Sequence, residues 1–149
     1  MVTPPAHTIF AENRKARFDY EIIEVFEAGI ELFWEEVKSI RKGSINLKWS
    51  YVLTNWLTAS LEQVHIWEYP GGMRRIDPKR VRRLLLSKKE VILLSTKVKN
   101  MGATIVPLEI YGKWNLIKAS IALVKGRKKW EKKQVLKERD LDREIKNYL

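Results

Sequence analysis

Two runs of alternating apolar residues in the last third of the chain restrict the fold more than any other feature. Residues 104–110 and 116–125 both alternate with a period of two, which is typical of a half-buried strand. The residues predicted to share a face are Thr104, Val106, Leu108 and Ile110 in the first run, and Ile117, Ala119, Ile121 and Leu123 in the second. Residues 112–115 between the runs are short enough for a hairpin loop. The sequence therefore predicts a β-hairpin.

Two clusters of cations accompany this hairpin. The first follows it directly and is opposed only by Glu131; it comprises Lys125, Arg127, Lys128, Lys129, Lys132 and Lys133. The second is opposed only by Asp77; it comprises Arg74, Arg75, Lys79, Arg80, Arg82, Arg83, Lys88 and Lys89. With a net charge of +11 and a pI near 9.9, these clusters favour a polyanionic partner, nucleic acid before an anionic membrane.

Composition excludes several classes of function. The 149 residues suit one domain with a real core. The absence of cysteine excludes disulfides, thiolate zinc ligands and a thiol nucleophile, so that only His7 and His65 could act as imidazole ligands or bases. No apolar run approaches the ~20 residues that span a bilayer, and the N-terminus lacks the order of a secretory signal. We expect a cytoplasmic monomer without membrane, metal or cofactor.

The chain before the hairpin predicts further strands. Residues 1–12 are predicted to form a flexible N-terminal leader. The even positions of residues 18–32 are mostly apolar and predict a long, bent strand, although a helix is the competing interpretation. Residues 45–54 alternate through Leu47, Trp49, Tyr51 and Leu53, and residues 59–67 form a weaker strand candidate.

Two helices and a loop are also predicted. Residues 35–42 begin with acids, end with cations and precede Gly43, as a short helix does. Residues 69–73 form a loop, and residues 79–86 fit either a helix or a strand. Ser87 and Glu90 have capping-box spacing, which predicts a helix that ends at Gly102 and buries Val91, Leu94, Val98 and Met101.

Together these elements predict an α+β domain built on an antiparallel, closed barrel of the oligonucleotide-binding (OB-fold) kind, with flanking helices. The barrel is expected over residues 13–126, after the leader at residues 1–12. A basic C-terminal tail, helical or disordered, is expected over residues 127–149.

Like charges at i,i+4 dominate this tail, and each such pair opposes an isolated helix by about 0.2–0.5 kcal/mol. The pairs are Lys128 with Lys132, Lys129 with Lys133, Lys133 with Lys137, Arg139 with Arg143, and Glu138 with Asp142. One hypothesis is that the first half of the tail is disordered in the free protein and becomes helical when phosphates neutralise its lysines. The alternative is a solvated helix docked on the barrel by Leu141 and Ile145.

Several motifs, in this order and spacing, resemble the small protein B family, the SsrA-binding proteins of bacterial trans-translation. They are ENRKARFDYEI from Glu12, FEAGI from Phe26, EVKSIR from Glu36, DPKRVRRLLLSKKE from Asp77, GATIVPLEIY from Gly102 and IALVKGRKKWEKK from Ile121. The resemblance implies an OB-fold barrel that binds the tRNA-like domain of transfer-messenger RNA (tmRNA, or SsrA RNA) and enters stalled ribosomes with it. It also implies that the tail becomes a helix in the empty messenger channel, beside the small-subunit decoding centre.

The same resemblance implies two sets of functional residues. The RNA-contact candidates are Asn13, Glu27, Leu85, Lys118, Arg127 and Lys128. The residues expected to act in the tail are Gly126, Trp130, Glu131, Lys132 and Lys133. The three cations of the first set would meet phosphates, and the amide of Asn13 could read a base or sugar edge. Glu27 is expected to accept from a 2′-hydroxyl or to hold an arginine, while the chemistry of Leu85 favours the core.

The chain departs from the family pattern at Trp34, Glu35, Trp49, Trp56, Leu57, Arg75, Ile76, Val81, Ser87, Glu131 and Lys133. Trp56 and Trp114 fall in expected turns, where glycine or asparagine would suit the backbone better. They are either stacking platforms for bases or contacts within the fold.

A non-enzymatic RNA-binding adaptor is the function that these features favour. The alternative is a generic barrel for single-stranded or ribosomal RNA. A membrane-surface protein would need a basic helix with a broad apolar face, which the sequence does not offer. A metal-dependent nuclease would need converging carboxylates, but Glu24 has the opposite strand parity to Glu27 and Glu31.

Overall fold

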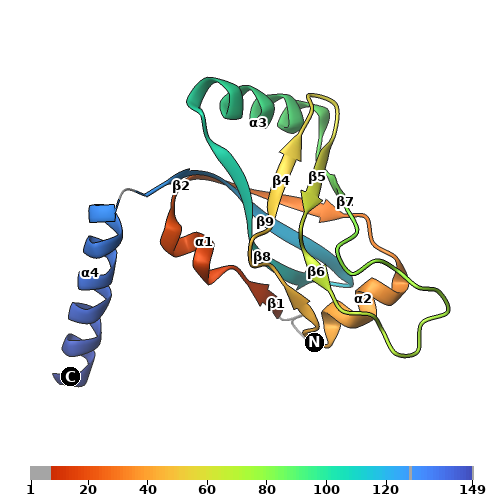
Figure 1. Cartoon of the computed structure of the whole chain (residues 1–149), viewed down its shortest axis with the longest axis horizontal. Helices are drawn as coiled ribbons and strands as arrows, with labels where there is room; N and C mark the ends of the chain where they lie inside the picture. The colour runs from red at the N-terminus through yellow and green to blue at the C-terminus, as the bar shows by residue number, and fades with distance from the viewer. Residues whose placement is uncertain (1–7, 128, 149) are drawn as a thin grey trace, which may run out of the picture.

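The computed structural model describes residues 8–127 and 129–148. These residues form an α+β fold in which a curved sheet of antiparallel strand pairs is flanked by helices, and the C-terminal helix projects away from it (Figure 1). Within these two ranges, no helix combines the length and the apolar character that crossing a membrane requires.

Seven strands make up the main sheet, in the order β1-β8-β4-β5-β7-β2-β9, and β8 also pairs with β9. Their bounds are β1 Thr8–Glu12, β2 Tyr20–Ile30, β4 Tyr51–Thr54, β5 Ala59–Glu62, β7 Arg82–Leu85, β8 Thr104–Lys113 and β9 Leu116–Gly126. Two short strands, β3 Ile45–Asn46 and β6 His65–Ile66, form a separate pair.

The predicted hairpin is confirmed as β8 and β9, which pair from Thr104 with Val124 to Lys113 with Leu116. The shared apolar face is confirmed for β9, whose four predicted residues all lie in the main core. For β8 the prediction is wrong, because a register shift between Pro107 and Glu109 reverses the alternation. Val106 and Leu108 consequently pack in a second, smaller cluster, while Ile110 lies in the main core.

Two of the helices match their predictions closely. Helix α2 (Trp34–Arg41) ends before Gly43, which adopts a left-handed φ of +78°. Helix α3 (Lys88–Met101) begins with the predicted capping box, in which the Ser87 hydroxyl accepts from the Glu90 amide, and it ends at Gly102. Met101 is predicted to be buried, but 38% of it is exposed.

Helix α1 (Arg14–Asp19) was not predicted. It covers the smaller core cluster, in which its buried Ala16 packs against residues of both β8 and β9. The leader prediction is wrong for residues 8–12, because β1 pairs with β8 there. The long strand begins at Tyr20 instead of residue 18, and the helical alternative for it is wrong.

Two predicted strands are interrupted by residues with a left-handed backbone. Trp49, with a φ of +67°, separates β3 from β4. After this break Val52 is buried and Leu53 is 52% exposed, so the predicted apolar face is reversed. Gln63, with a φ of +62°, separates β5 from β6 in the same way. Residues 79–86, whose sequence fits either a helix or a strand, contain the strand β7 and are therefore extended over Arg82–Leu85.

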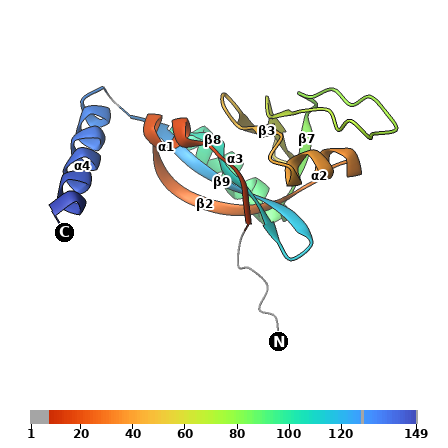
Figure 2. The same ribbon diagram turned by 90° about the horizontal axis from the view of Figure 1, so that it is seen from below.

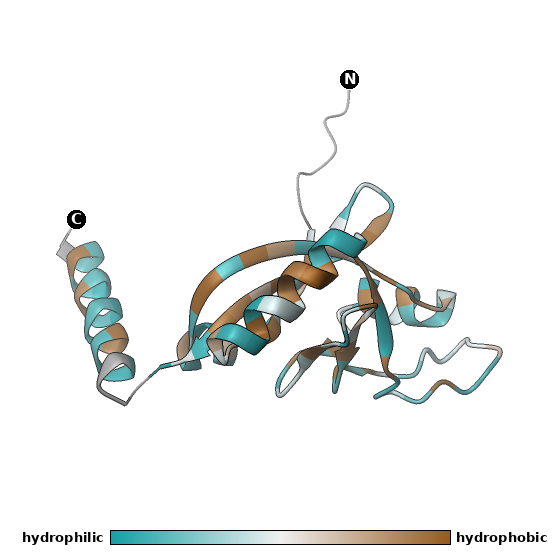
Figure 3. Cartoon of the chain, turned by 90° about the horizontal axis from the view of Figure 1, so that it is seen from above, coloured by the Kyte–Doolittle hydropathy of each residue, from teal (hydrophilic) through white to brown (hydrophobic). Residues whose placement is uncertain are grey.

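Helix α4 (Lys129–Tyr148) stands apart from the sheet in both Figure 1 and Figure 2. Leu141 and Ile145 are 57% and 56% exposed, so the predicted docking of the tail through these residues is wrong. The first half of the tail, which we hypothesised to be disordered, is also helical in this structure. Figure 3 shows that the helix is predominantly hydrophilic, in contrast to the apolar residues of β2.

Candidate nucleic-acid interface

Leu85 and Lys118 line one groove where β2, β7 and β9 meet. The groove has a volume of about 310 Å³ and is lined by Gly29, Ile30, Leu32, Val37, Leu85, Asn115, Leu116, Ile117 and Lys118. Gly29 on β2 is central to it, because it pairs with Leu85 on one side and with Lys118 on the other. A Cβ atom on Gly29 would lie only 3.2 Å from the Cβ atom of Leu85, so a side chain there would press on Leu85.

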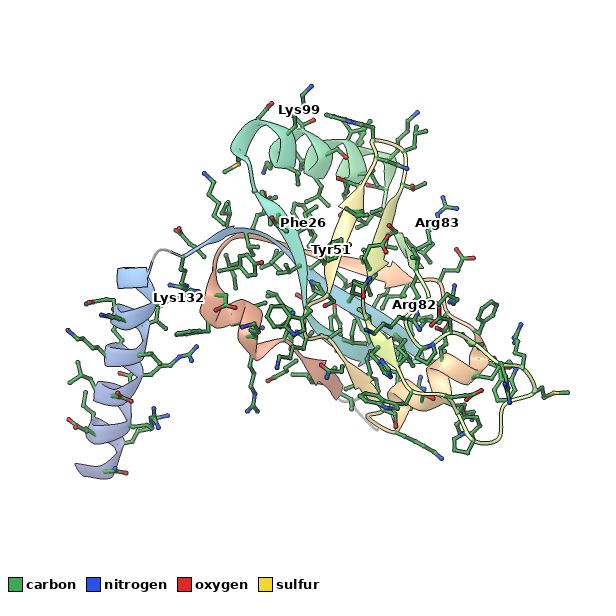
Figure 4. The ribbon with its side chains drawn as sticks, in the orientation of Figure 1. Phe26, Tyr51, Arg82, Arg83, Lys99 and Lys132 are labelled. Carbon is green, nitrogen blue, oxygen red and sulfur yellow. The ribbon has the colours of Figure 1, made fainter. Side chains whose placement is uncertain are left out.

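Leu85 is 55% exposed, so the expectation that it belongs to the core is wrong. The cause is the alternation of β7, which turns Arg82 and Leu84 inward and Arg83 and Leu85 outward. Figure 4 shows Arg82 among the inner side chains and Arg83 pointing away from the sheet. Leu85 thus offers an apolar surface in the groove that Lys118 also lines, a combination that suits a nucleotide's sugar or base together with its phosphate.

Glu27 lies on the same strand, two residues before Gly29. Its carboxylate accepts a hydrogen bond from the Tyr111 hydroxyl and lies 3.5 Å from the Lys113 ammonium. The Tyr111 hydrogen bond is the main reason that the pKa of Glu27 is lowered, and Lys113 and Lys118 lower it further. Burial and the same hydrogen bond raise the pKa of Tyr111. Glu27 is therefore an ionised acceptor held by a tyrosine and a lysine, and of its two predicted roles the pairing with a neighbouring arginine is not found among the described residues.

Arg127 lies at the opposite end of the β2–β9 pairing. Its backbone amide donates to the Asp19 carbonyl at 2.8 Å, and its Nε donates to the Tyr20 carbonyl at 3.1 Å. A guanidinium has five N–H donors, so this anchored side chain retains donors for a phosphate. Along β9, the eight residue-to-residue steps from Lys118 to Gly126 correspond to at most about 27 Å. The candidate contacts therefore form two groups, one at each end of a long strand pair.

Lys132 connects α4 to the second group. Its ammonium lies 3.2 Å from the Asp19 carboxylate, and Lys15 Nζ lies 3.1 Å from the same carboxylate. Burial alone would raise the pKa of Asp19, but the hydrogen bonds from the two lysines outweigh it and lower the pKa. Figure 4 shows Lys132 on the side of α4 that faces α1.

Asn13 is 5% exposed, and its amide is used inside the protein. Its Oδ1 accepts from the Ala16 amide at 3.1 Å, which caps α1, and its Nδ2 donates to the Pro107 carbonyl at 3.0 Å. A second, longer bond of 3.4 Å joins Nδ2 to the Leu47 carbonyl. Asn13 thus fixes α1 against β8, and in this structure its side chain is not directed at solvent.

The other predicted tail residues are less constrained or lie outside the described part. Among the residues that the structure describes, nothing lies within 4 Å of a Cβ atom added to Gly126, and the Lys133 side chain is exposed. Lys128 lies outside the described residues. Trp130 and Glu131 belong to α4, but their side chains also lie outside what the structure describes.

Part of the second basic cluster is internal. Arg82 is fully buried and donates through Nε to Glu36 at 2.8 Å, and Arg80 pairs with the same carboxylate. Arg74 pairs with the buried Glu35 at 3.0 Å. Burial alone would raise the pKa of Glu36, but hydrogen bonds from Arg80, the Phe33 amide and Arg82 lower it. The buried Arg82 is therefore unavailable to a polyanionic partner, whereas Arg74 and Arg80 are partly exposed but already paired with acids.

Comparison with known proteins decides the family. A family model described as SmpB protein matches residues 10–149. The chain belongs to the SmpB protein family. An SsrA-binding protein from Sulfurihydrogenibium sp. is 48% identical over 138 residues, which cover 92% of this chain and 91% of the relative. One from Enterococcus hirae is 46% identical over 138 residues, which cover 92% of this chain and 90% of the relative.

A solved SmpB structure is also similar. It is described as "tmRNA-SmpB: a journey to the center of the bacterial ribosome", and its chain has a TM-score of 0.67 and 41% identity to this one. The alignment covers 80% of this chain and 85% of that chain.

Sequence reasoning about this SmpB-family chain missed Gly29, Tyr111 and Asp19. Gly29 separates Leu85 from Lys118, Tyr111 fixes Glu27, and Asp19 holds α4. Gly29 stands inside a strand pattern, which is a signal of close backbone approach, and could have been found for that reason. The partners of Tyr111 and Asp19 lie far away in the sequence, so no local pattern reveals them.

Proposed function

We propose that this chain is a non-enzymatic adaptor that binds the tRNA-like domain of tmRNA and delivers it to stalled ribosomes for trans-translation, a form of ribosome rescue. One observation carries the proposal: the groove at Gly29 brings Leu85 and Lys118 together beside the ionised Glu27. The names of the relatives, SsrA-binding proteins, support tmRNA as the partner.

The proposed scaffold is an OB-fold barrel over residues 13–126. The strand pairings support it, since β8, β4, β5, β7, β2 and β9 follow one another and β9 pairs again with β8. Barrels of this kind bind oligonucleotides on an exposed face of their sheet.

In the groove and beside it, each candidate residue has a distinct proposed task. Lys118 neutralises a phosphate, and Leu85 packs against a ribose or base. Glu27 still has free lone pairs after its bonds to Tyr111 and Lys113, so it can accept from a 2′-hydroxyl. A 2′-hydroxyl contact would distinguish RNA from DNA at this position.

At the far end of β9, Arg127 and Lys128 are proposed to contact a second phosphate segment. Asn13 is proposed to act through the position of α1, because its amide is already committed to Ala16 and Pro107. This division of tasks makes Asn13 a positioning residue.

The tail at residues 127–149 is proposed to contact the ribosome, in the messenger channel beside the small-subunit decoding centre. Its separation from the sheet supports this role, because the exposed Leu141 and Ile145 are available to a partner. Gly126 and residues 130–133 would join the tail to the barrel and direct it. With a ribosomal partner, the protein is proposed to act in the cytoplasm.

A gel-shift comparison tests the proposal with three RNAs: full-length tmRNA, an ordinary tRNA and an unstructured oligonucleotide. We expect the tightest binding to tmRNA, with Lys118→Ala weakening that complex. Equal affinity for all three would favour the alternative, a generic RNA-binding barrel. No binding to any of them would contradict both.

A further inference from the structure

A second hollow, with a volume of about 230 Å³, lies beside the hydrogen-bonded pair of short strands β3 and β6. It is lined by Asn46, Lys48, Trp49, Gln63, His65, Trp67 and Lys79. None of these residues lines the groove at Gly29, so the two sites are distinct.

Two tryptophans border this hollow and are largely exposed. Trp49 is 70% exposed and Trp67 is 49% exposed, and the His65 ring lies 4.3 Å from the Trp67 ring. Trp49 and Gln63 both have a left-handed backbone, with φ values of +67° and +62°. Non-glycine residues rarely adopt this conformation, and such residues cluster at binding sites. The large Trp49 ring is therefore exposed to solvent at a position whose backbone conformation is unfavourable for a non-glycine residue.

Among the described residues, the lining includes two lysines and no carboxylate. Lys48 and Lys79 are exposed, and neither ammonium forms an ion pair with the residues that the structure describes. The ammonium groups of Lys15 and Lys48 lie 4.6 Å and 5.9 Å from the centre of the Trp49 ring. Because lysine side chains are flexible, the Lys48 ammonium can move from the ring to a phosphate when a base stacks there, whereas the Lys15 ammonium also pairs with Asp19.

We propose that this hollow binds an unpaired nucleotide of single-stranded RNA. A base stacks on Trp49 or Trp67, and Lys48 and Lys79 neutralise the adjoining phosphates, since base stacking and cationic contacts together bind single strands without sequence preference. The side-chain amides of Asn46 and Gln63 both donate and accept, so they can contact base edges. This site goes beyond the proposed function, because it requires neither a tRNA-like fold nor the groove at Gly29.

The direct test uses the ¹⁵N-labelled full chain and an unstructured hexaribonucleotide. The indole N–H signals of the six tryptophans are followed by NMR, and those of Trp49 and Trp67 are assigned from the Trp49→Phe and Trp67→Phe variants. We expect these two signals to shift together and to saturate, while the Trp56 signal stays in place. No shift of either signal, or equal shifts of all exposed tryptophans, would overturn the proposal.

Matched variants test the energetics. Trp49→Gly removes the ring and suits the positive φ, and Trp56→Gly is its control, because Trp56 is also exposed and has a φ of +72° but lines neither site. We expect Trp49→Gly to weaken hexaribonucleotide binding at least about 5-fold and Trp56→Gly to leave it unchanged. Equal effects of the two, with both amide spectra native, would contradict a stacking role.

Lys118→Ala separates this site from the proposed function. We expect Lys118→Ala to leave hexaribonucleotide binding intact while it weakens tmRNA binding. If Lys118→Ala abolishes hexaribonucleotide binding and Trp49→Gly does not, the oligonucleotide occupies the groove and the second site is refuted.

Discussion

The Lys132 ammonium near the start of α4 lies 3.2 Å from the Asp19 carboxylate at the end of α1. The same carboxylate also pairs with Lys15. Helix α4 projects from the sheet, and its orientation therefore depends on an ion pair with Asp19 of helix α1. Because the Lys132 and Asp19 side chains are both partly exposed, a competing phosphate can replace this contact.

Asp19→Asn should loosen α4 with little effect on global stability. The substitution removes the negative charge that attracts Lys132, and a partly exposed pair contributes about 0–1 kcal/mol to the free energy of unfolding. ¹⁵N relaxation should show lower order parameters for residues 132–147 in this variant. Glu21→Gln is the control, since Glu21 is exposed on the adjoining strand, and it should leave the tail unchanged. An equally ordered α4 in Asp19→Asn would show that other contacts orient the helix.

Glu36→Gln should destabilise the fold by about 3 kcal/mol, because it leaves the fully buried Arg82 without its counter-charge. Urea unfolding measures this change. Glu31→Gln, at an exposed position, should change the free energy of unfolding by less than about 0.5 kcal/mol. A loss at Glu36 as small as that at Glu31 would mean that the buried arginine tolerates neutralisation of its partner.

Glu36 should also contribute to acid sensitivity. Its pKa in the folded protein lies below the usual 4.5, so its stabilising effect is present above that value and is lost as the pH falls through the lowered pKa. Between about pH 5 and pH 3, the wild-type protein should therefore lose more free energy of unfolding than Glu36→Gln. Urea unfolding of both proteins across this range measures the difference. If the free energy of unfolding changes equally with pH in the two proteins, Glu36 does not contribute to acid sensitivity.

Lys118→Ala should weaken tmRNA binding and reduce its salt dependence. Removal of one phosphate interaction should decrease the log–log slope of affinity against salt by about 0.7–0.9. Lys99→Ala is the matched control, because Lys99 is an exposed lysine on α3, outside the groove (Figure 4). Slopes that are identical for wild type and Lys118→Ala would exclude a phosphate contact at this position.

Tyr111→Phe should raise the pKa of Glu27, because it removes the hydrogen bond that contributes most to lowering that pKa. The titration of the Glu27 side-chain carboxyl, followed by ¹³C NMR, measures this change. Tyr51→Phe removes a hydroxyl from a tyrosine on β4 and should leave the Glu27 titration unaltered. A Glu27 pKa that does not respond to Tyr111→Phe would indicate that Lys113 and Lys118 are sufficient.

Local patterns in the sequence predicted the elements that depend on local interactions. Helix α3 was found from Ser87 and Glu90, which bond to each other across three residues. The face of β9 was predicted correctly because Ile117, Ala119, Ile121 and Leu123 all pack in the main core. In β8 the same reasoning failed at the register shift after Pro107, since an irregularity of this kind depends on the partner strand.

The features that escaped prediction depend on distant partners. Arg82 appeared to be a surface cation in a basic run, but its acceptor Glu36 lies 46 positions earlier. Helix α1 has only six residues, and the Asn13 side chain that starts it is held by Pro107, 94 positions later. For the candidate site, the sequence predicted Leu85 and Lys118 as contact residues. Their position on either side of Gly29 and the exposure of Leu85 became apparent only in the tertiary structure.

The direct passage from β9 into the C-terminal helix has a mechanical consequence. β9 is hydrogen-bonded to β2 on one edge and to β8 on the other over most of its length. A load applied to the helix along the strand axis would act on both ladders in shear, so many bonds would have to break together. Traction on the tail should consequently extend or detach the helix well before it extracts the strand.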